Sequence, residues 1–199
     1  TSMKDKTIVL PNWDPLTMPL LAANLKAEGL DAMVMTETKD SIQRALKHNT
    51  GQCIPLNTIA QGFMESIRQN DLDPAQTLLW MSKSVIACNI KLYPHHIRTI
   101  LKAHGNGFEK AGVYVGNLNF IDVSVKAALN TYFAYMFGGY LRKMGCKIRP
   151  YELKKGSTDR VIKWSLKLFS EVFENRDSKE AALEKVIGAF AQIKTRNTK

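Results

Sequence analysis

The hydrophobic positions of the first 120 residues alternate between short β-rich runs and helically spaced segments. The runs predict four strands, at 7–10, 32–35, 77–81 and 112–115. The segments between them carry apolar residues three or four positions apart and predict helices, at 15–28, 39–47, 56–69 and from about 94 through 101. Strands that alternate with helices are typical of a parallel sheet. We therefore predict an α/β fold with a mostly parallel sheet of about four strands and helices on both faces.

The remaining residues predict a helical C-terminal third. A long helical pattern covers 122–143, where Gly138 and Gly139 indicate either a kink or the close approach of another backbone. Residues 147–152 are predicted to be extended because Pro150 disfavours helical backbone at the residue before it. Two helices should close the chain, the first capped by Ser157 and the second starting at Asp177.

This pattern predicts how the chain is organised. We expect an α/β core over residues 1–120 and a helical subregion over 121–199 packed on it, together forming one compact domain.

Composition indicates a folded protein that does not cross a membrane. The chain has 199 residues, of which 45% are hydrophobic and 23% charged. Its apolar stretches are broken well before the roughly 20 residues that a membrane span needs, and no leader pattern precedes the first strand. Three cysteines are an odd number and argue against a secreted disulfide framework. We therefore expect a cytoplasmic protein with reduced thiols.

The positive charge is concentrated near the C-terminus. The net charge is +10, and residues 140–199 hold 15 Lys and Arg against 7 Asp and Glu. This segment has no zinc-finger spacing, no glycine-aromatic RNA signature and no recognition helix, which disfavours nucleic acid as a partner. A solvated basic face, or one that meets an acidic partner domain, is the better interpretation.

Two cysteines fall in predicted loops and are the main candidates for chemistry. Cys53 lies just before a helix that Pro55 can start, and the free N–H groups at a helix N-terminus favour a thiolate. Cys88 follows the third predicted strand. Loops at the carboxyl ends of parallel strands form the ligand crevice of such sheets. We therefore predict that both thiols point into this crevice as metal ligands. Cys146 follows the long helical pattern instead.

Three segments carry a resemblance to a known family. Gly51-Gln52-Cys53-Ile54-Pro55 opens a helix, Cys88 follows the next strand, and Ile148-Arg149-Pro150-Tyr151-Glu152 comes near the end. Together they resemble the 2-hydroxyacyl-CoA dehydratase component family, and more closely the dehydratase-like region of large CoA-substrate-specific enzyme activase proteins. The likeness runs from about residue 6 to residue 195.

The resemblance implies an iron–sulfur protein of the lyase type. In that family, cysteines at the positions of Cys53 and Cys88 hold a [4Fe-4S] cluster, and a later cysteine supplies a third ligand. Cys146 is the remaining thiol here. The dehydratases remove water from a 2-hydroxyacyl-CoA by a radical route, after an ATP-driven activator injects one electron. The implied partners are an acyl-CoA and a dehydratase or activator subunit, or the remaining domains of a larger polypeptide.

The chain departs from the family pattern in two respects. The sequence before the second cysteine, which is often Gly-Pro-Cys-Arg, is here Ile86-Ala87-Cys88-Asn89. The chain is also short for a complete subunit and has no glycine-rich phosphate loop, so we interpret it as one domain of a larger protein.

Other interpretations of the same residues remain open. The fold can persist without a cluster, as an interaction module whose basic C-terminal face docks on a partner domain. Cys146 can be a packed residue at a helix end. Arg149 and Tyr151 can meet the phosphates of coenzyme A, or the Arg-Pro-Tyr turn can clamp the terminal helices onto the sheet.

Overall fold

A four-stranded parallel sheet forms the centre of the structure. The computed structural model describes residues 3–48, 51, 53–83 and 88–196. The strands are β1 (Thr7–Leu10), β2 (Asp31–Val34), β3 (Thr77–Ser82) and β4 (Gly112–Gly116). They lie in the order β2-β1-β3-β4, and every pair is parallel. The predicted α/β fold with about four strands is therefore confirmed, and each strand lies within one residue of its predicted position.

The strand order places a topological switch point between β1 and β3. From β1 the chain crosses to β2 on one side, and then returns to β3 and β4 on the other. Thr7 is the register partner of both Asp31 and Thr77, so β1 is paired along both edges. In open α/β sheets, ligands bind outside the carboxyl ends of the strands at such a switch point.

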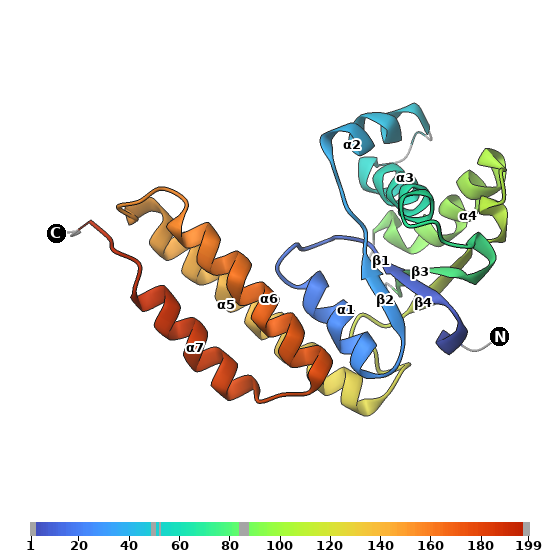
Figure 1. Ribbon diagram of the computed structural model, residues 1–199. Helices are drawn as coiled ribbons and strands as arrows, with labels where there is room; N and C mark the ends of the chain where they lie inside the picture. The colour runs from blue at the N-terminus through green and yellow to red at the C-terminus, as the bar shows by residue number, and fades with distance from the viewer. Residues whose placement is uncertain (1–2, 49–50, 52, 84–87, 197–199) are drawn as a thin grey trace.

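Helices cover both faces of the sheet (Figure 1). The first layer contains four helices: α1 (Met18–Ala27), which packs against the sheet, and beyond it α5 (Val125–Ile148), α6 (Ser157–Asn175) and α7 (Lys179–Ala191). The second layer contains three, α2 (Lys39–Ala45), α3 (Ile54–Gln69) and α4 (Tyr93–His104). Short 3₁₀ turns join these elements, at Met3–Asp5, Leu46–His48, Pro74–Gln76, Asn89–Leu92, Phe108–Lys110 and Arg149–Tyr151.

The alternation of side chains along β1 divides the core in two. Ile8 and Leu10 pack in the cluster on the side of α1, whereas Val9 packs in the cluster on the side of α3. Successive residues of a strand point to opposite faces, so both neighbours of Val9 must face the first layer. All three side chains are buried, as expected for a strand covered on both faces.

The first core cluster includes residues from both the α/β part and the C-terminal helices, with Ile8 and Phe190 among them. Within the described residues, no helix is both long enough and apolar enough to cross a membrane.

The prediction that residues 147–152 are extended is wrong. Helix α5 continues to Ile148, and Arg149–Tyr151 forms a 3₁₀ turn. Arg149 has φ −51° and ψ −40°, and its guanidinium donates two hydrogen bonds to Asp159, at 2.9 and 2.7 Å. Arg149 therefore has helical backbone where it makes these tertiary contacts, although Pro150, which follows it, disfavours that conformation.

The predicted caps of the last two helices are also wrong. Gly156, with φ 81°, is the N-cap of α6, and Ser157 is the first helical residue. The carboxylate of Glu152 accepts the backbone N–H groups of Gly156 and Thr158 and does the capping instead. Helix α7 is capped by Ser178, whose hydroxyl accepts the N–H of Ala181 at 3.2 Å.

Of the two explanations for Gly138 and Gly139, the structure supports close approach. A Cβ on Gly138 would lie 2.3 Å from Thr17 Oγ1 and 3.1 Å from the carbonyl oxygen of Leu16, at the start of α1. Helix α5 runs through both glycines without a break.

Candidate functional site

Cys53 lies at the N-terminus of α3, as the sequence predicts. It is the N-cap residue, with extended backbone at φ −67° and ψ 147°, and Pro55 occupies the first turn of the helix. Helix N–H groups without intrahelical partners point toward this end, where they stabilise negative charge. Cys53 is half-buried against the second core cluster. Gln52 lies outside the described residues.

Cys88 follows β3 and precedes the 3₁₀ turn Asn89–Leu92. Its side chain is exposed. Ile86 and Ala87, which form part of the departure from the family pattern, lie outside the described residues.

One side chain contacts both thiols. The Oδ1 atom of Asn89 is 3.8 Å from Cys53 Sγ and 3.6 Å from Cys88 Sγ. The Nδ2 atom of the same amide is 3.6 Å from Cys53 Sγ. The fold therefore brings together two cysteines that are 35 positions apart in the chain.

Tyr93 supplies a second polar contact to Cys53. Its hydroxyl is hydrogen-bonded to Cys53 Sγ, while its ring is buried in the second core cluster. Tyr93 is the first residue of α4, which packs beside α3, so two adjacent helix N-termini position the pair.

The surroundings of Cys53 favour its thiolate form. The hydrogen bond with Tyr93 is the main factor that lowers the pKa of Cys53, and the Asn89 amide acts in the same direction against the effect of burial. Burial raises the pKa of Tyr93, and its hydrogen bond to Cys53 and the charges of both thiols raise it further. When Cys53 is a thiolate, Tyr93 donates this hydrogen bond and the sulfur accepts it.

Cys146 does not join this pair. It is exposed on α5, in the helical layer on the other face of the sheet. The interpretation of Cys146 as a packed residue at a helix end is therefore wrong. Within the part of the chain that the structure describes, no group of three or more His, Cys, Asp or Glu side chains is placed to hold a metal ion. The donor set around Asn89 thus consists of two thiols, which are the ligand type that iron–sulfur clusters use.

A cavity of about 190 Å³ with a mixed lining lies beside the start of α3. It is lined by Asn12 after β1, by Thr36 and Glu37 after β2, and by Pro55 and Thr58 of α3. The cavity therefore lies beyond the carboxyl ends of β1 and β2, on the other side of β1 from the switch point. The Oδ1 atom of Asn12 is buried and has no hydrogen-bond partner within the described residues.

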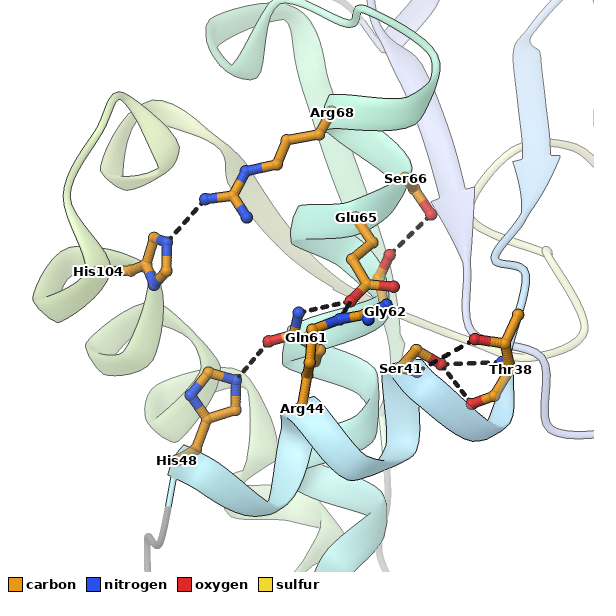
Figure 2. A network of polar contacts seen from close by, with 10 residues as sticks. All are labelled: Thr38, Ser41, Arg44, His48, Gln61, Gly62, Glu65, Ser66, Arg68 and His104. Carbon is orange, nitrogen blue, oxygen red and sulfur yellow. Dashed lines mark hydrogen bonds and ion pairs between the residues drawn. The ribbon is translucent and has the colours of Figure 1, made fainter.

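A network of polar side chains links α3 to the segment that precedes Cys53 (Figure 2). The sequence does not predict this network. Buried Glu65 accepts hydrogen bonds from Arg44 at 2.7 Å and from Gln61 at 2.6 Å, and Gln61 in turn contacts His48 at 3.0 Å. Arg44 and His48 belong to the segment that leads into the Cys53 loop. The network therefore holds that segment against α3. Helical spacing predicts the faces of a helix, but it does not predict which buried polar groups meet across two helices.

A larger open groove lies between the start of α6 and the end of α7. Its volume is about 540 Å³, and its lining includes Lys154, Arg160, Lys194 and Trp164 but no acidic residue. The chain end closes one side, where Leu153 donates its N–H to the carbonyl of Lys194 at 2.9 Å. Sequence analysis predicts a basic C-terminal third but not this groove.

Arg149 and Tyr151 join the terminal elements. Arg149 forms an ion pair with Asp159 of α6, and the carbonyl of Tyr151 accepts the N–H of Arg196 at 2.8 Å. These contacts join the terminal elements to one another and not to the sheet.

Comparison with protein families, with curated proteins and with solved structures finds no match to this chain.

Proposed function

We propose that this chain is a domain of the 2-hydroxyacyl-CoA dehydratase and enzyme-activase type, in which Cys53 and Cys88 provide two ligands to a [4Fe-4S] cluster. The observation that carries the proposal is the contact of both thiols with the amide of Asn89. Core packing does not explain why Cys53 and Cys88 lie together, because Cys88 is exposed. An iron–sulfur cluster bound by both thiolates would explain the arrangement.

The residues around the pair suit that role. The half-buried thiol of Cys53 has a lowered pKa, which favours the deprotonated form that binds iron. Tyr93 and the Nδ2 group of Asn89 donate hydrogen bonds to its sulfur, and such bonds adjust the reduction potential of a cluster. When bound, the cluster supplies one-electron chemistry, and the protein supplies ligation, orientation and burial.

The proposal leaves part of the coordination to other groups. A [4Fe-4S] cluster is usually held by four protein ligands, and the structure brings two thiols together. We infer that the others come from a dehydratase or activator subunit, or from further domains of a larger polypeptide. The acyl-CoA substrate would be shared with that partner. The free state of all three cysteines fits a reducing compartment, so we place the protein in the cytoplasm.

Anaerobic reconstitution with iron, sulfide and a small thiol, which can fill the coordination positions left to the partner, tests this function. The expected result is bound iron and acid-labile sulfide, with the visible absorption of an iron–sulfur cluster. Cys53→Ser and Cys88→Ser should each lose most of both. Cys146→Ser is the matched control and should keep them. A correctly folded protein that binds no iron, or that binds it equally in all three variants, would refute the proposal.

A cluster-free interaction module is the second candidate function, and the basic groove between α6 and α7 favours it. Lys154, Arg160 and Lys194 line this groove without any acidic residue, which suits an acidic partner domain. This function predicts association with the partner that weakens as salt rises and that survives replacement of all three cysteines by serine. The reconstitution experiment separates the two candidates.

A further inference from the structure

Helix α5 has two apolar faces, of which only one is packed. Ala127, Ala134 and Leu141 are buried toward α1 and α6. Four large apolar side chains lie on the opposite face, with exposed fractions of 68% for Val125, 63% for Leu129, 66% for Tyr132 and 49% for Met136. A surface helix normally turns polar residues, not large apolar ones, toward the solvent. The exposed apolar face of α5 is therefore a candidate contact surface for another molecule.

The spacing of these four residues, which we call the α5 seam, is that of a coiled coil. Successive members are four, three and four positions apart, which is the heptad spacing of the a and d positions. Gly139 and Lys143 continue the same spacing. The outer side of Gly139 is open, since a Cβ there would meet no atom within 4 Å, so a partner backbone can approach closely. Scattered surface residues do not repeat in this way.

The described part of the chain provides no cover for the seam. Helix α5 packs against α1 and α6 through its other face, and it is not suited to cross a membrane. Exposed apolar surface of this kind marks a protein–protein or membrane contact, and the heptad spacing of the seam favours a partner helix.

The charged residues on the helix of the α5 seam are basic, which favours a partner with acidic residues. Helix α5 contains Lys126, Arg142, Lys143 and Lys147 but no acidic residue. Arg142 is paired with Asp14 at 2.6 Å, whereas Lys126 and Lys143 form no ion pair with any residue that the structure describes. Lys179 of α7 adds a further positive charge near the ring of Phe133.

A second copy of the chain is a poor occupant, because each copy carries a net charge of +10 and the two α5 helices would bring basic rims together. The positions that flank a coiled-coil seam set partner choice through their charges. Acidic residues at those positions of the partner helix would complement Lys126 and Lys143.

We propose that the α5 seam binds an amphipathic helix of a partner protein or domain, with an apolar heptad face flanked by Glu or Asp. Val125, Leu129, Tyr132 and Met136 pack against the apolar face of that helix, and Lys126 and Lys143 pair with its acidic flanks. This surface is separate from the cysteine pair, which lies in the other helical layer, so the inference does not depend on a cluster.

A synthetic helix tests the inference directly. The probe is a fluorescent four-heptad peptide with Leu at positions a and d and Glu at positions e and g, and the comparison peptide carries Lys at e and g. Anisotropy should show that the Glu peptide binds, that binding weakens as salt rises, and that the Lys peptide does not bind. The double variant Leu129→Gln with Met136→Gln should weaken binding by about tenfold or more, since it removes two apolar contacts without changing charge.

The matched control is Leu46→Gln with Ile187→Gln, two exposed apolar residues outside α5. It should bind the Glu peptide as the unchanged protein does. Circular dichroism and urea unfolding verify that both double variants are folded. Equal binding of the two peptides, or loss of binding only in the control, would overturn the proposal. A dimer in sedimentation analysis that the Leu129 and Met136 changes disrupt would also overturn it, because the occupant would then be a second copy.

Discussion

The phenolic hydroxyl of Tyr93 is hydrogen-bonded to the sulfur of Cys53, across the contact between the N-termini of α4 and α3. Tyr93 is buried and Cys53 is half-buried, so water competes little for this bond. It makes Cys53 chemically different from the exposed thiols of Cys88 and Cys146.

Tyr93→Phe should therefore raise the pKa of Cys53 toward the ordinary value of a thiol. The hydrogen bond favours the thiolate, so its loss lowers the thiolate fraction at neutral pH. We expect alkylation of Cys53 by iodoacetamide at neutral pH to slow by about threefold to tenfold, since one pKa unit changes the thiolate fraction tenfold. Mass spectrometry of the Cys53 peptide measures the rate. Tyr132→Phe, at an exposed site on α5, is the control and should leave the rate unchanged.

Gly138 and Gly139 are adjacent in α5 but should respond oppositely to alanine. Gly138→Ala places a methyl group against Thr17 and Leu16, and such overpacking typically costs about 1–3 kcal/mol. Gly139→Ala meets open space and should gain up to about 1 kcal/mol from the higher helix propensity of alanine. Urea unfolding monitored by circular dichroism measures both. Equal effects at the two positions would contradict the close approach of α1 to α5.

Glu65 should make the stability of the protein depend on acidic pH. The hydrogen bond from Arg44 is the main cause that lowers the pKa of Glu65 in the folded state, and Gln61 adds to it. The resulting stabilisation is present above the unfolded-state pKa of about 4.3 and is lost as pH falls through the lower folded-state pKa.

Glu65→Gln should accordingly reduce the loss of stability between about pH 6 and pH 3. The free energy of unfolding in urea, measured across that range, provides the check. Glu171→Gln, at an exposed site on α6, is the control and should follow the unchanged protein. A Glu65→Gln protein with the same pH dependence as the unchanged protein would show that the network in Figure 2 contributes little.

Glu152 should be needed for the start of α6. Its carboxylate accepts the N–H groups of Gly156 and Thr158, and its pKa is lowered mainly by Thr158. Glu152→Ala leaves these groups without their acceptor and should lower the urea midpoint. Glu152→Gln keeps one acceptor oxygen and should have an intermediate midpoint. Glu184→Ala, at an exposed position of α7, is the comparison; an equal decrease there would argue against a capping role for Glu152.

Part of the candidate site could be predicted from the sequence. Pro55 indicates a helix start, and Cys53 is indeed the N-cap residue of that helix. The third predicted strand places Cys88 in the loop beyond its carboxyl end. Asn89 and Tyr93 could not be assigned to the site, because spacing along the chain does not indicate where an amide or a hydroxyl points.

The sequence by itself determined the layered α/β architecture. Strands such as Thr7–Leu10 and helices such as α3 follow from side-chain periodicity, which is a local property. Contacts between distant segments decided the rest. The order β2-β1-β3-β4, the meeting of Cys53 with Tyr93, and the capping of α6 by Glu152 depend on pairs of residues that come together only on folding. The helical conformation of Arg149 beside Asp159 is the clearest case, because there a local preference for extended backbone is not followed in the folded chain.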